Sequence, residues 1–263
     1  MSSSIREPAV AGFFYPDDPA VLERTLDRYL DPAPETLPHP PRALVVPHAG
    51  YIYSGEVAAK AFRLLSGHEA RFRRVVLVGP AHRMPVRGMA LPESAAFATP
   101  LGEVSLDRPL VDELAAWPGV VRSDAVHAHE HSLEVQLPFL QRLLPDARLV
   151  PVAVGDATAE QVEQLLDHCL DDHTLLIIST DLSHYLSYHE ARRTDQDTLE
   201  RIAEGDWRLH GEQACGCRGV NGLLRLADRR SWTSRLLEYR NSGDTAGSKD
   251  RVVGYAALVF EDA

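Results

Sequence analysis

Three histidines each follow a short apolar run of the kind that forms a buried strand. His48 comes after the run at 42–46, His82 after the run at 74–78, and His184 after the run at 174–178. Imidazole is the commonest metal ligand in proteins and the usual acid or base near neutral pH. One such histidine is most often structural, but three in equivalent positions predict a metal or acid–base site where their loops meet.

Cys215 is a fourth candidate for this site, because it lies at a loop-to-helix junction. A helix N-terminus lowers the pKa of a nearby thiol, so Cys215 could complete a metal site with two histidines. The alternative is a buried cysteine that acts as a small apolar residue. Cys217 is only two positions away, which is not the spacing of a zinc ribbon. Alternate residues tend to point apart, so we expect one of these two thiols in the site.

Acidic and aromatic neighbours complete the candidate set. Asp181 precedes His184 by three residues, a pair that suits an oriented histidine acting as acid or base. In the run of alternating histidines at 127–131, we expect only His131, beside a helix start, to face inward. Glu134 is three residues on and could hydrogen-bond His131 or orient a ligand. Tyr51 is a candidate pocket wall, with core packing as the alternative.

Parallel strands are needed to bring these loops together. Apolar runs at 42–46, 74–78, 148–154 and 174–178 predict buried strands, with helical patterns between them. Parallel strands joined by crossover helices place their carboxyl-end loops at one sheet edge. We predict one α/β domain over residues 1–263, with a mostly parallel central sheet flanked by helices.

Three local features refine this prediction. Helices are expected at 55–65 and 221–227, after the loops that carry His48 and Cys215. A helix from residue 132 onward should kink at Pro138. The chain should close in a β-hairpin formed by 234–239 and 252–260.

Composition excludes several classes of protein. The formal net charge of −11 argues against a nucleic-acid binder, which needs a basic face. The 263 residues are 44% hydrophobic, enough for a sizeable core, yet no apolar run has the length of a membrane span. The first residues lack the apolar core of a signal peptide, and three cysteines make no disulfide framework. We therefore expect a cytoplasmic protein that binds neither membrane nor nucleic acid.

Taken together, six ordered motifs resemble the Memo family, and most closely its prokaryotic branch, the AmmeMemoRadiSam system protein B. They are REPAVAG at 6–12, VPHAGY at 46–51, GPAH at 79–82, EHSLEVQLP at 130–138, STDLSHY at 179–185 and CG at 215–216. This resemblance covers nearly the whole chain, and the ordered combination is highly specific.

The resemblance implies a fold similar to the class III extradiol dioxygenases, the LigB-like non-haem iron enzymes. Those enzymes hold Fe(II) with two histidines and a carboxylate, and a further histidine acts as acid or base. Memo proteins have a cysteine in place of the carboxylate. By position, His48 and His82 match the metal histidines and Cys215 matches the cysteine. His184, with Asp181, matches the acid/base histidine. Cys217 departs from the expected non-thiol neighbour.

The implied function is a metal-dependent redox enzyme containing Fe(II), with copper or zinc as alternatives. A thiolate is a softer ligand than a carboxylate and shifts preference toward Cu(I), Zn or a different iron chemistry. The family name also implies a radical SAM protein and an Ammecr-domain protein as partners. Two other functions are open at this point. One is a non-catalytic module that binds a metal or a peptide in a vestigial pocket. The other is a zinc hydrolase, since two histidines, a cysteine and a water form an allowed catalytic zinc set.

Overall fold

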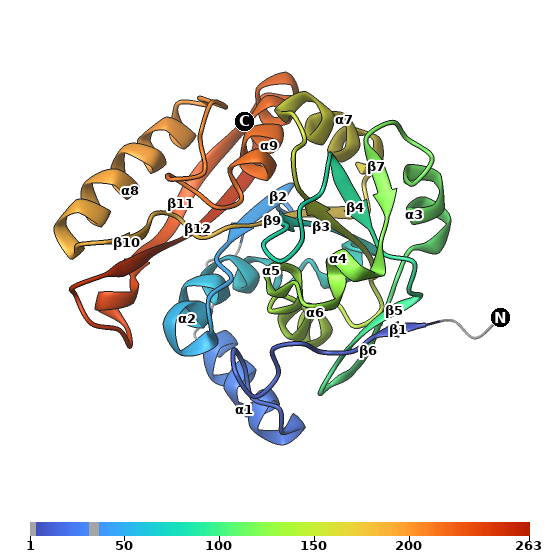
Figure 1. Ribbon diagram of the computed structural model, residues 1–263, viewed down its shortest axis with the longest axis horizontal. Helices are drawn as coiled ribbons and strands as arrows, with labels where there is room; N and C mark the ends of the chain where they lie inside the picture. The colour runs from blue at the N-terminus through green and yellow to red at the C-terminus, as the bar shows by residue number, and fades with distance from the viewer. Residues whose placement is uncertain (1–3, 32–36) are drawn as a thin grey trace.

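The computed structural model describes residues 4–31 and 37–263. Most of its strands belong to one central sheet (Figure 1). The strands are β1 (Ile5–Arg6), β2 (Ala43–Val46), β3 (Arg74–Pro80), β4 (Met89–Leu91), β5 (Ala96–Thr99), β6 (Gly102–Ser105), β7 (Val120–Arg122), β8 (Arg148–Val154), β9 (Thr174–Ser179), β10 (His184–Leu186), β11 (Trp232–Asn241) and β12 (Val252–Asp262).

The central sheet has nine strands in the order β10-β12-β2-β9-β3-β8-β4-β7, with β11 paired to β12. Its middle, β2-β9-β3-β8, is parallel, whereas β12 and β4 join this middle in antiparallel pairs. The four strands predicted from apolar runs are therefore confirmed, and the sheet as a whole is mixed. The predicted closing hairpin is also confirmed, since β11 and β12 pair antiparallel.

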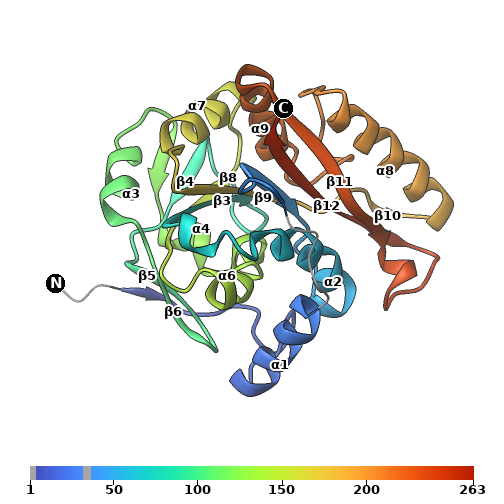
Figure 2. The same ribbon diagram turned by 180° about the vertical axis from the view of Figure 1, so that it is seen from behind.

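Helices cover both faces of the sheet (Figure 2). Alternate residues of each central strand point to opposite faces, so two apolar clusters form. One cluster packs under α1, α2 and α6, and the other under α3, α7 and α9. The helices are α1 (Pro19–Leu30), α2 (Tyr51–Phe62), α3 (Arg108–Leu114), α4 (Asp124–Ala128), α5 (His131–Glu134), α6 (Leu137–Leu143), α7 (Ala159–Cys169), α8 (Tyr188–Ala203) and α9 (Cys217–Arg230). The chain thus folds as a single α/β domain, as predicted.

Two helices begin earlier than predicted, and one predicted helix is broken. The helix α2 starts at Tyr51 rather than at residue 55, because Gly50 occupies the N-cap and the Tyr51 N–H donates to Phe14 O. The helix α9 starts at Cys217 rather than at residue 221. Pro138 stands in the first turn of α6, so the predicted kink is a break between α5 and α6.

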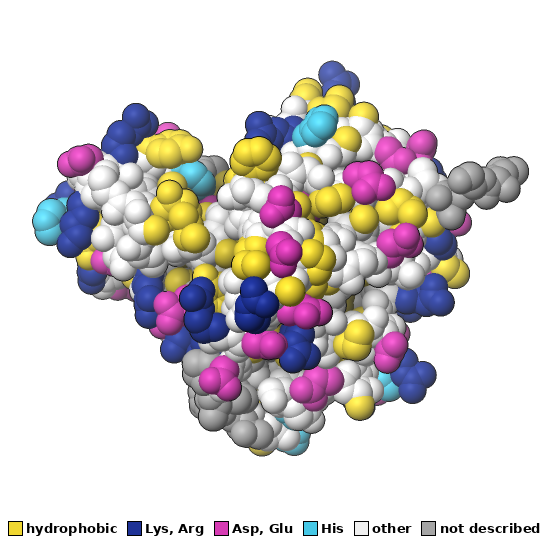
Figure 3. Space-filling view, turned by 90° about the horizontal axis from the view of Figure 1, so that it is seen from below, with side chains coloured by type: hydrophobic (Ala, Val, Ile, Leu, Met, Phe, Trp, Pro, Cys, Tyr) yellow, Lys and Arg dark blue, Asp and Glu magenta, His cyan; other side chains and the backbone are white. Residues whose placement is uncertain are grey.

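The surface carries mixed charge. On the face shown in Figure 3, basic and acidic side chains are interspersed, with apolar side chains between them. Within the described ranges, every helix is too short or too polar to cross a membrane.

Glu134 anchors the N-terminal segment, which corrects its predicted place beside His131. Its carboxylate is fully buried and pairs with the guanidinium of Arg6. It also accepts hydrogen bonds from the N–H groups of Ala9 and Val10 and from the hydroxyl of Tyr15. A charged guanidinium forms a stronger hydrogen bond with a buried carboxylate than a neutral imidazole does. Glu134 therefore pairs with Arg6 and not with His131. The segment before α1 is therefore tied to α5.

We predict that Arg6→Ala lowers the free energy of unfolding by about 3–5 kcal/mol, because Glu134 would remain as an unpaired buried charge. Urea denaturation measures this loss. The control is Arg42→Ala, which breaks an exposed ion pair with Asp262 and should cost about 1 kcal/mol or less. Equal losses for the two variants would contradict the anchoring role of Arg6.

Candidate metal centre

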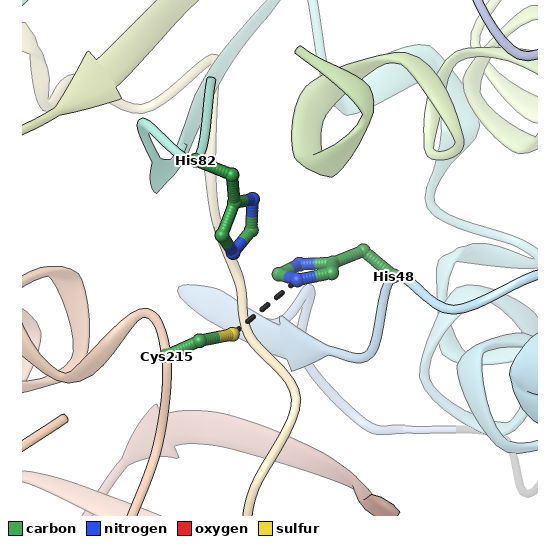
Figure 4. Close-up of side chains that lie close together, drawn as sticks. All are labelled: His48, His82 and Cys215. Carbon is green, nitrogen blue, oxygen red and sulfur yellow. Dashed lines mark hydrogen bonds between the residues drawn. The ribbon is translucent and has the colours of Figure 1, made fainter. Parts of the chain in front are cut away.

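Three potential ligands from distant parts of the chain converge at the carboxyl ends of the parallel strands. His48 follows β2, His82 follows β3, and Cys215 precedes α9. One ligand atom from each lies within 4.8 Å of the other two. Figure 4 shows the two imidazoles and the thiol facing one another, with Cys215 Sγ 3.3 Å from His48 Nε2. The structure thus brings together the three residues that the sequence analysis singled out as ligands.

The hydrogen-bond network around Ser179 fixes the tautomer of His48. The Ser179 hydroxyl donates its proton to Ser132 O at 2.6 Å, so its oxygen accepts from Gln136 Nε2 and from His48 Nδ1, both at 3.0 Å. The proton of the imidazole therefore sits on Nδ1, and Nε2 presents a lone pair toward Cys215. Burial, with a further contribution from His82, lowers the pKa of His48 to about 3. A neutral imidazole with Nε2 free is the form that binds a metal.

Glu130 holds His82 in place, a role that the sequence analysis missed. Its buried carboxylate accepts from the backbone N–H of His82 and lies 3.0 Å from His82 Nδ1. Burial alone would raise the pKa of this carboxyl, but hydrogen bonds from His82 and Ser132 outweigh it and hold the pKa at about 2. The two residues are 48 positions apart. The sequence signals for Glu130 were its place inside the histidine-rich run at 127–131 and at the start of the motif at 130–138.

Cys215 is the thiol that faces the histidines, and Cys217, the first residue of α9, is buried in the core. Gly216 allows this placement, because an added Cβ would lie 2.7 Å from Thr180 Cβ and 2.8 Å from Ser179 O. The expected lowering of the thiol pKa is wrong. Burial, followed by the charge of Asp181, raises the pKa of Cys215 to about 12. These two effects exceed that of the helix N-terminus.

Asp181 and His184 lie near the ligands, but they are not a hydrogen-bonded pair. The buried Asp181 carboxylate accepts from the backbone N–H of His48 at 2.8 Å and so fixes the His48 loop. Burial raises the pKa of Asp181. Among the hydrogen bonds of residues 4–31 and 37–263, none joins Asp181 to His184. His184 is half-buried in β10, and its proposed role in proton transfer stays a prediction.

His131 lies beside the ligands, whereas its neighbours in the histidine run do not. The His131 ring stacks on His82 with centroids 4.9 Å apart, and it lies 5.4 Å from the ring of His48. Gly79 lets α5 approach β3 this closely, since an added Cβ would lie 2.8 Å from Ser132 Oγ. His127 is buried and bonds Ala90 O, while His129 is exposed.

Tyr51 belongs to the core rather than to the pocket. Its side chain is 5% exposed, packs on Phe139 and Tyr29, and donates its hydroxyl proton to Val135 O. The core-packing alternative for Tyr51 is therefore the one observed.

Two adjoining pockets open beside the ligands. One, of about 970 Å³, is lined by His184, Arg193 and Thr194, and the other, of about 670 Å³, by Val86, Thr158 and Arg218. Both pockets include His82 and Cys215 in their walls. A small molecule in either pocket would contact the ligand cluster directly.

A family model and sequence relatives match nearly the whole chain. A family model described as "Memo-like protein" matches residues 6–259. A MEMO1 family protein of Methanopyrus kandleri is 36% identical over 97% of this chain and 98% of its own. One from Aquifex aeolicus is 34% identical over 97% of this chain and 99% of its own. The crystal structure of an uncharacterized protein from Escherichia coli K12 aligns with a TM-score of 0.49 at 15% identity, covering 81% of this chain and 98% of its own.

We predict that Ser179→Ala destabilises the protein by about 1–3 kcal/mol, because it leaves Ser132 O and His48 Nδ1 without a partner and removes one of the two hydrogen bonds of Gln136 Nε2. The proton of His48 should then redistribute between the two ring nitrogens. Denaturation and ¹⁵N NMR of the imidazole measure these effects. The control Ser54→Ala removes one hydrogen bond to Ala49 O and should leave the His48 tautomer unchanged. An unaltered tautomer in Ser179→Ala would contradict the assignment.

His127 should make stability depend on pH. Burial lowers its pKa to about 4 in the folded protein, whereas an unfolded histidine titrates near its ordinary value. Between these values the unfolded chain binds the extra proton, so stability falls as the pH falls. His127 alone should cost about 2 kcal/mol at pH 5 relative to pH 7. Denaturation of wild type and His127→Gln at both pH values measures the difference, and identical pH slopes would rule it out.

Proposed function

The chain belongs to the Memo family, and we propose that it is a metal-dependent redox enzyme with His48, His82 and Cys215 as ligands. The observation that carries the proposal is the convergence of two imidazoles and one thiol within 4.8 Å of one another beside two pockets. Fe(II) is the proposed metal, with copper or zinc as the alternatives.

The donor set fits a metal ion. Around a tetrahedral ion bound to sulfur at about 2.3 Å and nitrogen at about 2.0 Å, the two donor atoms lie roughly 3.5 Å apart. Cys215 Sγ and His48 Nε2 are 3.3 Å apart, close to that spacing. Each imidazole is also held by a hydrogen bond to a residue that is not itself a proposed ligand of this site. His48 bonds Ser179, and His82 bonds Glu130. Such partners are typical of metal-binding histidines.

A bound iron or copper ion would supply a Lewis acid and a one-electron redox centre at this position. The chain's own residues would do the rest. Asp181 fixes the loop of His48, and Glu130 orients His82. In the pocket that it shares with His82 and Cys215, His184 would accept or donate a proton at its imidazole. His48 and Asp181 are buried, whereas His82 is exposed and lines both pockets.

The cellular setting is part of the same proposal. By family resemblance, we propose a radical SAM protein and an Ammecr-domain protein as partners. A cytoplasmic location is supported by three cysteines with free thiols, which suit a reducing compartment. The likeness to extradiol dioxygenases is proposed on the same grounds, from the arrangement of His48, His82 and His184.

Metal binding tests the proposal. Anaerobically prepared protein should bind one Fe(II) or Cu(I) at this site, and His48→Ala or Cys215→Ala should weaken binding by more than about 100-fold, since each removes a ligand. Cys217→Ser is the matched control and should bind as wild type does, because Cys217 packs in the core. Equal affinity in all four proteins would refute the ligand assignment.

Catalysis is tested with His184→Ala. This variant should keep the metal affinity of wild type within about threefold and lose oxygen consumption with catechols as test substrates. Wild-type protein that binds metal yet never exceeds the His184→Ala background would favour the non-catalytic binding module. Zinc as the bound metal of freshly made protein, with no iron or copper, would favour a hydrolase.

A further inference from the structure

A second set of metal donors lies on the other side of His82. Glu130, His131 and His82 each offer one atom within 4.8 Å of the others. In Figure 4 one ring nitrogen of His82 faces Cys215 and His48. Because Nδ1 of His82 contacts Glu130, the nitrogen that faces Cys215 and His48 is Nε2. The two nitrogens of one imidazole therefore belong to two different donor sets.

The spacing of the second set suits a metal ion. Glu130 Oε1 lies 3.0 Å from His82 Nδ1 and 3.6 Å from His131 Nδ1. Donors bound at about 2.0–2.1 Å in a tetrahedral site lie roughly 3.3–3.4 Å apart. Shifts of a few tenths of an ångström would bring both distances to that value.

His131 Nδ1 lacks the partner that a buried nitrogen normally has. Within the described part of the chain it is buried and forms no hydrogen bond. The ring cannot turn freely, because it is packed between Phe14 and His82. A buried nitrogen that forms no hydrogen bond keeps its lone pair available to coordinate an ion.

Among residues 4–31 and 37–263, no lysine or arginine pairs with the carboxylate of Glu130. It is fully buried, and its hydrogen bonds come from two backbone N–H groups and the ring of His82. The ion pairs described for it involve only His82 and His131. Glu134, four residues on, is equally buried and has Arg6. Hydrogen bonds already offset the burial of the Glu130 carboxylate, but they leave its negative charge without a neighbouring guanidinium of the kind that Glu134 has. A divalent cation at Glu130 would supply the positive charge.

We propose that the imidazole of His82 bridges two metal positions, one completed by His48 and Cys215 and the other by Glu130 and His131. Occupancy of both positions releases two protons to solvent, one from His82 Nδ1 and one from the Cys215 thiol. The bridging imidazolate, the thiolate and the carboxylate then carry three negative charges against the four positive charges of two divalent ions. The inference rests on the proposed metal site but concerns a second ion.

A purely orienting role for Glu130 is the competing explanation. It would account for the 3.0 Å contact with His82 Nδ1, which is an ordinary hydrogen-bond distance. It leaves the unpaired nitrogen of His131 unexplained. The two explanations differ in the number of ions that the protein binds.

Zinc stoichiometry separates them. Metal-free protein titrated with Zn²⁺ should bind two equivalents tightly, and His131→Phe, which keeps a ring packed against Phe14, should bind one. Glu130→Gln should also bind one. The control His129→Ala removes an exposed histidine from the same segment and should still bind two. Circular dichroism and thermal melting of the metal-free variants establish that each is folded.

Copper gives a readout that does not depend on affinity. Wild type loaded with two equivalents of Cu²⁺ should show the electron paramagnetic resonance signature of two coupled ions, and His131→Phe should show one isolated ion. Two tight equivalents in His131→Phe, or a single equivalent in wild type, would overturn the second site. That result would leave the first site intact. A different result would refute the first site: His48→Ala and Cys215→Ala would then bind as much zinc as wild type does.

Discussion

Two buried carboxylates, four residues apart, determine how the molecule is built around its candidate site. Neither Glu130 nor Glu134 reaches water, so each must find its donors inside the protein. Glu134 binds Arg6 and the backbone N–H groups of Ala9 and Val10, and these bonds hold the N-terminal segment against α5. Glu130 binds the backbone and the ring of His82. The short helix α5, which begins after Glu130 and ends at Glu134, carries His131 and packs on β3, so the constraint that orders the N-terminal segment also orders the candidate ligands.

The sequence predicted the central strands and the histidines that follow them, because each strand is a continuous apolar run that ends in a polar loop. His48 and His82 could be identified in this way, since parallel strands require their loops to share one edge of the sheet. Cys215 could be identified as a candidate, but the choice between Cys215 and Cys217 depended on where the α9 helix begins. Gly216, the N-cap of α9, packs so closely on the end of β9 that an added Cβ would clash there, a long-range contact that no local pattern encodes.

Other parts of the site could not be predicted, for physical reasons that differ from residue to residue. Glu134 stands at helical spacing from His131, yet an arginine 128 positions away is the better partner. Tyr51 follows the His48 loop but begins a helix, and its ring packs against Phe139 and Tyr29 in the core. The thiol of Cys215 lies at a helix N-terminus, but desolvation and the charge of Asp181 dominate its pKa. In each case a long-range contact outweighs a local tendency.

The distance along the chain between the candidate ligands has a consequence for biogenesis. His48 and Cys215 are 167 residues apart, and the sheet between them includes pairings of β2, β3 and β9 that join remote segments. Contacts of this kind form late in folding, because a long loop must close at an entropic cost before the contacts can stabilise the chain. In a small zinc finger the ion itself drives folding, whereas here the complete ligand set exists only once the native sheet is assembled. A metal would therefore find all three candidate ligands only after the chain has folded. A nascent chain that still lacks its last fifty or so residues would contain His48 and His82 but not Cys215.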